Sequence, residues 1–326
     1  MKTLFSIICV LLLLSFSVTL SGCINPDNEF DTTVGTWRTA QTIQPYVYHE
    51  HIDENYSVNV LPFTNPGDQK SALLAGGLDM TGTTIALAIT SASKGEPIVI
   101  VSSLCNKCSA IVVREGSDIE TPADLKGKTI AYVPGTMHHV LLLETLKQEG
   151  LDPDVDVILK RIDFFDMGQA LSRGTVDAFC SGEPYPSLAV AEGYGRILTY
   201  PYYGDNIGTI NAGMITTKNK IENDRDKIQS LVTAHAKTTQ HLNQNKEEWL
   251  TLAETFGTSR DVLEIAEPNM ELVWDIDDDD YIENTRNLAI EMYELGMINE
   301  VPDIDSMFDL SFVEEARNKT NNTNIT

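Results

Sequence analysis

Residues 124–142, DLKGKTIAYVPGTMHHVLL, contain a complete strand–turn–helix unit. The β-branched and apolar residues of 128–133 predict a buried strand, Gly135 marks a turn, and a helix is expected over 139–149. Similar units occur on both sides of this segment, so strands and helices alternate from residue 32 to residue 200. Such alternation predicts an α/β fold with a mostly parallel sheet and helices on both of its faces.

The other elements extend this pattern in both directions. On the N-terminal side we expect helices over 40–51, 69–76 and 83–94, and strands over 32–36, 57–61, 79–82, 97–102 and 109–114. On the C-terminal side we expect helices over 167–173 and 184–192, and strands over 155–161, 176–179, 196–200 and 212–216. Two long helices follow. His235 lies in the apolar stripe of the first and is expected to be a hydrogen-bonded, half-buried residue.

The first 22 residues are typical of a secretory signal peptide. Lys2 supplies a positive start, residues 4–20 are apolar apart from Ser and Thr, and Leu-Ser-Gly-Cys at 20–23 matches a lipobox. Cleavage there would leave Cys23 lipidated at the mature N-terminus, followed by a linker over 23–30. The alternative is an uncleaved anchor, although the apolar run is marginal in length for a membrane span. Both alternatives predict an exported protein on the outer face of the cytoplasmic membrane.

Length and charge limit the possible architectures and partners. A net charge of −25 would repel phosphates, so we expect no nucleic-acid partner. The mature chain is long enough for two lobes, which we place at 31–114 plus 212–317 (lobe I) and at 115–211 (lobe II). Two crossings between the lobes would form a hinge beside a ligand cleft. The tail over 318–326, which carries three Asn-x-Thr patterns, is expected to be disordered.

Three motifs occur in order along the chain: ALLAGGLD at 72–79, the quoted 124–142 segment, and ALSRGTVDA at 170–178 with Glu183-Pro184 after it. Together they resemble the nitrate/sulfonate/taurine-type solute-binding proteins of ABC importers, whose relatives include thiamine-pyrimidine-synthase-like proteins. The resemblance implies a type II periplasmic-binding-protein fold and a monomer that delivers its solute to ABC permease subunits. The solute would be small and anionic or sulfonate-like, such as an alkanesulfonate, nitrate or bicarbonate, or else a thiamine-pyrimidine precursor.

No enzymatic activity and no cofactor are expected. The sequence contains no Gly-x-Ser-x-Gly, His-Glu-x-x-His or P-loop motif. An alternative role for the same fold is a sensor that presents its bound ligand to a receptor.

Four predicted strand-to-helix junctions form the candidate ligand site, because ligands bind beyond the carboxyl ends of strands in open α/β sheets. Helix N-termini there favour anions. His139 aligns with a histidine of the family, and its alternative role is packing against its own turn below a hydroxyl cap. Arg38 could hold an anion through its guanidinium. The expected ligand contacts are Trp37, Arg38, Thr83, Thr84, Gly135, Thr136, His139, Glu183 and Tyr185.

Cys105-x-x-Cys108 departs from the family pattern. Together with Cys180 it gives an odd number of cysteines, and we expect a local disulfide or free thiols. A zinc site or an enzymatic centre is the alternative, and it would need Cys180 and His138 or His139 to complete the ligand set.

The acidic run at 275–280 lacks the central Gly and the distal Glu of an EF-hand calcium loop. We expect its charges to favour the N-terminus of the helix that begins near Tyr281.

Overall fold

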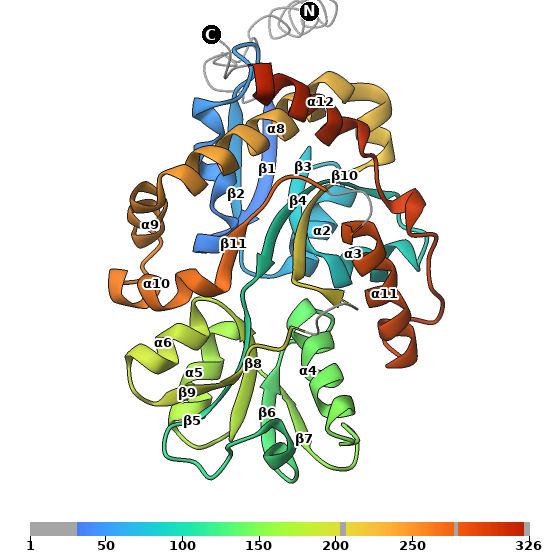
Figure 1. Cartoon of the computed structure of the whole chain (residues 1–326). Helices are drawn as coiled ribbons and strands as arrows, with labels where there is room; N and C mark the ends of the chain where they lie inside the picture. Colours follow the sequence, from blue (N-terminus) through green and yellow to red (C-terminus); the bar gives the residue numbers. More distant parts are fainter. Residues whose placement is uncertain (1–30, 203–206, 277–279, 323–326) are drawn as a thin grey trace, which may run out of the picture.

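Two β-sheets, one in each of two lobes, organise residues 31–202, 207–276 and 280–322, which the computed structural model describes (Figure 1). Within these residues the upper lobe of Figure 1 has the strand order β11-β4-β10-β3-β1-β2 and the lower lobe the order β7-β6-β8-β5-β9. The upper strands are β1 (Thr32–Trp37), β2 (Val58–Phe63), β3 (Met80–Thr84), β4 (Ile98–Lys107), β10 (Ile210–Thr217) and β11 (Met270–Leu272). The lower strands are β5 (Ser109–Arg114), β6 (Thr129–Tyr132), β7 (Ile158–Arg161), β8 (Ala178–Gly182) and β9 (Gly195–Thr199).

Both sheets are mixed, so the prediction of a mostly parallel sheet was wrong. β1 pairs in parallel with β2 and β3, and β6 pairs in parallel with β7 and β8. β10 runs antiparallel to β3 and β4, and β5 runs antiparallel to β8 and β9. β5 and β10 are the strands that follow a crossing between the lobes. Each therefore enters its sheet from the end at which the parallel strands stop, and this reverses its direction.

Helices cover both faces of the lower sheet (Figure 1). They are α4 (Met137–Gln148), α5 (Phe164–Ser172) and α6 (Tyr185–Ala191). Ile111 packs in one core cluster with Leu142 of α4, whereas its neighbour Val112 packs in another with Met167 of α5 and Ala189 of α6. This alternation along β5 is the period of two expected for a strand buried on both faces.

The upper lobe holds the largest apolar core. Its helices are α2 (Pro66–Leu74), α3 (Ile85–Ala92), α8 (Lys218–Gln244), α9 (Lys246–Glu254), α10 (Arg260–Ala266), α11 (Asp280–Glu294) and α12 (Ser311–Asn322). His235 of α8 is hydrogen-bonded as predicted, with Tyr48 Oη and Ser103 O each 2.8 Å from its ring nitrogens, but it is fully buried. The predicted helix over 40–51 forms two 3₁₀ segments, η1 (Ala40–Thr42) and η2 (Gln44–Glu50). Pro45 has no N–H to donate to a continuous α-helix.

The first crossing between the lobes lies at Lys107 and Cys108, whose φ angles of 61° and 67° are left-handed. This turn separates β4 from β5. The strand at 109–114, which the sequence assigned to lobe I, therefore lies in the lower sheet. The second crossing connects β9 to β10, and β10 already begins at Ile210 in the upper sheet.

At the C-terminus, α12 continues to Asn322, so the prediction of a disordered tail from residue 318 was wrong for residues 318–322. The predicted signal peptide, Cys23 and the linker over 23–30 lie outside the described residues, as do 277–279 of the acidic run and 323–326 of the tail.

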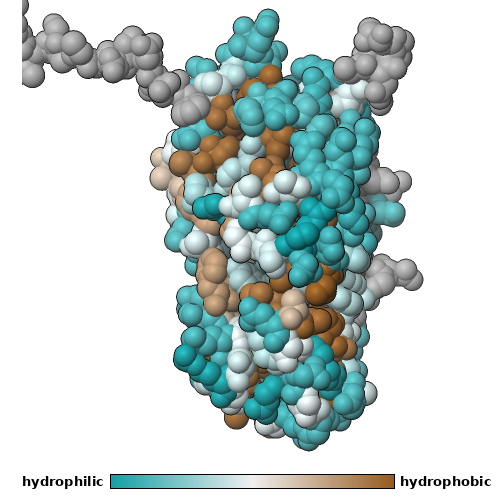
Figure 2. Space-filling view, turned by 90° about the vertical axis from the view of Figure 1, so that its left-hand side faces the viewer, coloured by the Kyte–Doolittle hydropathy of each residue, from teal (hydrophilic) through white to brown (hydrophobic). Residues whose placement is uncertain are grey.

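The molecular surface is mostly hydrophilic on the face that Figure 2 shows, and its apolar residues gather in separate patches. This surface fits the net charge of −25. Within the described residues no helix combines the length and the apolar character needed to cross a bilayer.

Helix α4 joins the two lobes. Near its C-terminus, Lys147 Nζ lies 2.7 Å from Glu291 Oε1 and 3.0 Å from Glu294 Oε2, both on α11 of the upper lobe. Glu144 lies beside this pair. Burial, and secondly a hydrogen bond with Glu291, raise the pKa of the Glu144 carboxyl from its ordinary value to about 7. The cluster thus holds more carboxyls than cations at the contact between the lobes.

The Glu144→Gln variant tests this cluster. Because the pKa of Glu144 is raised on folding, the folded protein binds the proton more tightly, and stability falls as pH rises from about 4.5 through about 7. A neutral amide removes that loss. We expect the variant and the parent to melt together at pH 5 and the variant to melt higher at pH 8 in calorimetry. Glu149→Gln, an exposed change after the same helix, is the control; equal melting of Glu144→Gln and parent at both pH values would contradict the assignment.

Candidate functional site

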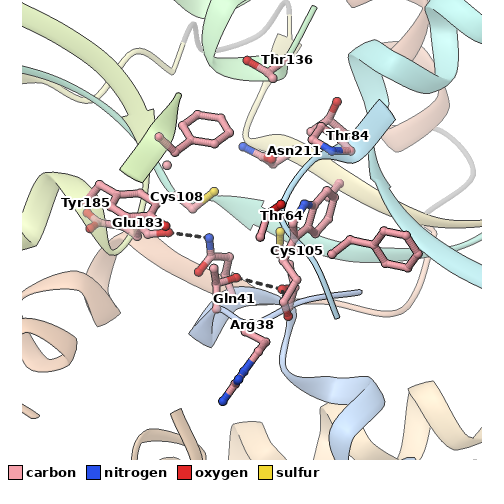
Figure 3. Close-up of a pocket in the computed structure, with 18 of the residues that line it drawn as sticks. Arg38, Gln41, Thr64, Thr84, Cys105, Cys108, Thr136, Glu183, Tyr185 and Asn211 are labelled. Atoms are coloured by element: carbon pink, nitrogen blue, oxygen red, sulfur yellow. Dashed lines mark hydrogen bonds between the residues drawn. The ribbon is translucent and has the colours of Figure 1, made fainter. Parts of the chain in front are cut away.

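A cavity of about 420 Å³ lies between the lobes (Figure 3). The carboxyl ends of β1, β3 and β8 and the loop between β6 and α4 contribute to its wall, so each of the four predicted junctions reaches the cavity. Large rings form much of this wall: Trp37, Phe63, Phe164, Phe165, Tyr185 and Phe256. The neutral polar side chains include Gln41, Thr64, Thr84, Thr136 and Asn211. The cavity is therefore largely apolar, with few groups that can orient a ligand.

The structure brings most of the predicted contacts to this cavity and leaves three outside its lining. Trp37, Arg38, Thr84, Thr136, Glu183 and Tyr185 line it. Thr83, Gly135 and His139 do not. The side chain of Thr83 is fully buried in β3, because successive residues of a strand point to opposite faces and Thr84 takes the cavity side.

The start of α4 presents His138 to the cavity and turns His139 away. Thr136 Oγ1 accepts from His139 N at 3.3 Å and donates to Val133 O at 2.9 Å. The His139 ring lies on Tyr132, with ring centroids 4.5 Å apart, and its Nδ1 accepts from Gly135 N. His139 therefore packs against its own turn, which was the alternative to a ligand contact.

His138 Nδ1 lies 2.8 Å from Ser109 Oγ, and burial lowers the pKa of its imidazole to about 4. His138 therefore lines the cavity as a neutral ring at physiological pH.

Two glycines allow the walls of the cavity to approach each other. A Cβ on Gly82 would meet Leu104 Cδ2 at 2.8 Å and the Trp37 ring at 3.2 Å. A Cβ on Gly182 would meet the His138 ring at 2.8 Å. All three distances are shorter than Cβ atoms normally adopt, so glycine lets Trp37 and His138 lie against the strands.

Glu183 is a buried carboxyl in the cavity wall, only 1% exposed. Its Oε1 accepts from Asn269 Nδ2 and its Oε2 from Ser187 N, both at 3.2 Å. Burial raises the pKa of this carboxyl to about 7, and these hydrogen bonds oppose the rise only in part. Small changes near neutral pH therefore alter its charge.

Arg38 lies at the edge of the cavity. Its guanidinium carbon is 5.3 Å from the centre of the Phe256 ring, and its Nη2 lies 3.4 Å from Thr255 O. In Figure 3 the guanidinium points away from the other labelled side chains. The contact with an anion that the sequence suggested for Arg38 would need this side chain to turn inward.

All three described cysteines are free and buried, so the expectation of free thiols is confirmed and that of a disulfide is not. Cys105 and Cys108 line the cavity. A hydrogen bond with Cys105, followed by burial, raises the pKa of the Cys108 thiol well above its ordinary value, so it is a neutral, weakly reactive group.

Cys180 packs in the lower core and its Sγ donates to His138 O at 3.1 Å, so it cannot complete a zinc site with the other two. Within the described residues no group of three or more His, Cys, Asp or Glu side chains could hold a metal ion.

Sequence reasoning missed Gln41, Phe164 and Asn211. Gln41 lies in the 3₁₀ segment that was predicted as helix, Phe164 precedes the predicted start of its helix, and Asn211 lies just before the predicted strand. Each belongs to a junction next to a lobe crossing or to a strand end. A search of all residues within a few positions of the predicted strand ends would have included them.

Comparison with known proteins gives one family match. Residues 52–249, more than half of the chain, match the family described as NMT1/THI5 like.

Three curated proteins illustrate the relationship. A putative aliphatic sulfonates-binding protein of Escherichia coli (strain K12) is 32% identical over 155 residues, which cover 46% of this chain and 48% of that protein. A putative ABC transporter periplasmic binding protein of Brachyspira hyodysenteriae is 27% identical, covering 59% and 62% of the two chains. The 4-amino-5-hydroxymethyl-2-methylpyrimidine phosphate synthase of Candida albicans is 29% identical, covering 38% and 37%. The matched segment thus spans about half of the first relative and less than two thirds of the others.

Solved structures share the fold over most of their length. The ligand-binding component of an ABC-type import system from Staphylococcus aureus, with zinc bound, has a TM-score of 0.76 at 20% identity, covering 87% of this chain and 98% of that one. The aliphatic sulphonate-binding protein SsuA of Escherichia coli has a TM-score of 0.73 at 21% identity, covering 84% and 90%. The nitrate-binding protein NrtA of Synechocystis PCC 6803 has a TM-score of 0.74 at 17% identity, covering 90% of each chain. The type II periplasmic-binding-protein fold implied by the motifs is therefore confirmed.

Thr136→Val tests the cap that shapes the cavity side of α4. Valine has nearly the same size but can neither accept from His139 N nor donate to Val133 O. We expect the free energy of unfolding to fall by about 1 kcal/mol, the usual value of an N-cap. Urea denaturation measures the change, and Thr136→Ser, which keeps the hydroxyl, should stay close to the parent. Equal stability of the valine variant would show that the cap contributes nothing.

Proposed function

The chain belongs to the NMT1/THI5-like family, and from this premise we propose that it is the solute-binding component of an ABC-type importer. The observation that carries the proposal is the 420 Å³ cavity, because residues of both lobes line it and both crossings of the chain run beside it. A site of this kind captures a small molecule when the lobes close on it. Its cargo would then pass to membrane permease subunits.

Closure requires that the solute bind the closed form more tightly than the open form. The cavity supplies this difference, since Trp37 and Thr84 come from the upper lobe while Thr136 and Tyr185 come from the lower lobe. A solute between them contacts both lobes only when these are together. The ion pairs of Lys147 with Glu291 and Glu294 of α11 also connect the two lobes.

The proposal includes export and a lipid anchor. Residues 1–22 have the sequence of a signal peptide, and Cys23 is the residue that a lipobox would acylate. A lipid on the mature N-terminus would keep the protein beside its permease on the outer face of the membrane. Labelling of Cys23 by a radioactive fatty acid, abolished in Cys23→Ala, is the direct measurement.

Binding, without chemical conversion, is the role that the cavity supports. A hydrogen bond with Cys105, followed by burial, keeps the Cys108 thiol protonated, His138 is neutral, and the Glu183 carboxyl is held by Asn269 and Ser187. Ser109 Oγ and His138 Nδ1 form a hydroxyl–imidazole pair, but Ser109 is fully buried and does not line the cavity. The pair therefore presents no nucleophile to a bound solute.

Thr64→Trp tests whether the cavity is the binding site. Thr64 is exposed at the mouth of the cavity, so an indole there fills the space without disturbing the core. We screen alkanesulfonates, nitrate, bicarbonate, aminopyrimidines and alkylammonium ions by thermal shift. A solute at 100 times its dissociation constant should stabilise the parent by about 2.7 kcal/mol and leave Thr64→Trp unaffected.

Thr175→Trp is the matched control, since Thr175 is also exposed but does not line the cavity. It should respond like the parent. Stabilisation of Thr64→Trp by the same solute would place the binding site elsewhere and overturn the proposal.

A further inference from the structure

We infer that the solute carries a protonated amine, which Glu183 and Gln41 receive, and an apolar body that the aromatic rings of the cavity enclose. The inference rests on the proposed function and names its ligand class. It differs from the oxyanions named for the sulfonate- and nitrate-binding relatives. Three features of the cavity carry it: an unsatisfied acceptor, a buried acid without a cationic partner, and aromatic walls.

Gln41 supplies the unsatisfied acceptor. Its Nε2 donates to Glu183 O at 2.6 Å, which fixes the direction of the amide (Figure 3). Its Oε1 is buried without a hydrogen-bond partner among the described residues, and the whole residue is 7% exposed. Buried acceptors are normally satisfied, so this oxygen calls for a donor from outside the protein. An N–H group can provide it, whereas nitrate or a sulfonate cannot.

Glu183 supplies the acid. Within the described residues its hydrogen-bond partners are the Asn269 amide and the backbone and side chain of Ser187, all of them neutral donors. Each carboxylate oxygen can accept more than one hydrogen bond, so both retain capacity for a ligand. A buried carboxylate without a cation favours a positively charged neighbour and opposes an anion.

The other groups of the cavity lining do not reverse the preference of Glu183 for a positively charged ligand. Arg38 extends over Phe256 at the edge, away from Glu183 and Gln41. At the N-termini of α3 and α4, which could attract an anion, one N–H of each is taken by the helix's own cap: Leu87 N donates to Thr84 Oγ1 and His139 N to Thr136 Oγ1.

Trp37, Phe164 and Tyr185 offer ring faces, and the Phe164 and Tyr185 rings are stacked with an interplanar angle of 7°. Such faces attract ammonium groups as well as apolar bodies.

Titration of the cavity near neutral pH belongs to Glu183. The groups that face it are the Cys108 thiol, the phenols of Tyr200 and Tyr202, and, across the cavity, His138 and Arg38. A hydrogen bond with Cys105 and then burial raise the pKa of the thiol, and burial raises the pKa of both phenols and lowers that of His138. The thiol, the two phenols and His138 therefore stay neutral near pH 7. Ionisation of Glu183 near pH 7 should therefore strengthen the binding of an ammonium ion as pH rises and weaken that of an anion.

Benzylammonium and benzenesulfonate are the probes, because they share a ring and differ in the sign of the head; benzyl alcohol is the neutral control. We measure binding to the full mature chain by isothermal titration calorimetry at pH 6 and pH 8. We expect benzylammonium to bind at least tenfold more tightly than benzenesulfonate at pH 8. Its affinity should rise about tenfold from pH 6 to pH 8, as the ionised fraction of Glu183 grows from about a tenth to nine-tenths.

Variants identify the groups responsible. Glu183→Gln should lose most of the affinity for benzylammonium and its pH dependence. Should that variant not fold, Gln41→Met, which removes the orphan acceptor at similar length, should lower the affinity at both pH values. Arg38→Ala removes a positive charge at the edge and should increase the affinity for benzylammonium.

Tighter binding of benzenesulfonate, strengthened at pH 6 and lost in Arg38→Ala, would overturn the inference, as would absence of benzylammonium binding. The proposed function would still stand if another solute stabilised the parent and Thr175→Trp but not Thr64→Trp. It would fall only if no solute depended on the cavity.

Discussion

The convergence of strand ends on the crossing between the lobes is the constraint on which the rest of the structure depends. The parallel strands of both sheets end at this crossing, and the two strands that follow a crossing start there and run away from it. Strand ends leave backbone groups and helix N-termini unpaired by the sheets. The cavity lies where two such sets of ends face each other, and the side chains that line it come from the junctions.

The crossing at Cys108 links the cavity to the hinge. Cys108 N donates to Asn269 O at 2.7 Å in the upper lobe, and Cys108 O accepts from Glu183 N at 2.8 Å in the lower lobe. Asn269 in turn donates through its side chain to the Glu183 carboxyl. One short network therefore holds the crossing, both lobes and the buried acid together. A ligand that changes the charge or the hydrogen bonds of Glu183 acts directly on the segment about which the lobes would move.

The sequence predicted the order and type of most elements, because buried strands and amphipathic helices have strong periodicities. It could not predict their pairing. The apolar sequence of the strand at 109–114 would suit the core of either lobe. The left-handed turn at Lys107 and Cys108, a conformation that residues other than glycine seldom adopt, directs this strand into the lower sheet. The four junctions were predictable from strand ends.

The sequence could not predict which of two neighbouring residues at a junction lines the cavity. His138 and His139 differ by about 100° around α4, and the Tyr132 ring, which packs on His139, decides which one lines the cavity.

The identity of a ligand does not follow from similarity of fold, because the regular elements and the residues at the junctions vary separately. The fold is shared with structures at about 20% identity. Several side chains of the cavity come from short segments outside the long helices and the strands, where the chain can change without cost to the core. Gln41 occupies a 3₁₀ turn, and Arg38 lies in the loop before it. A change in which of these two side chains points inward would alter the charge of the cavity wall while every strand stays in place.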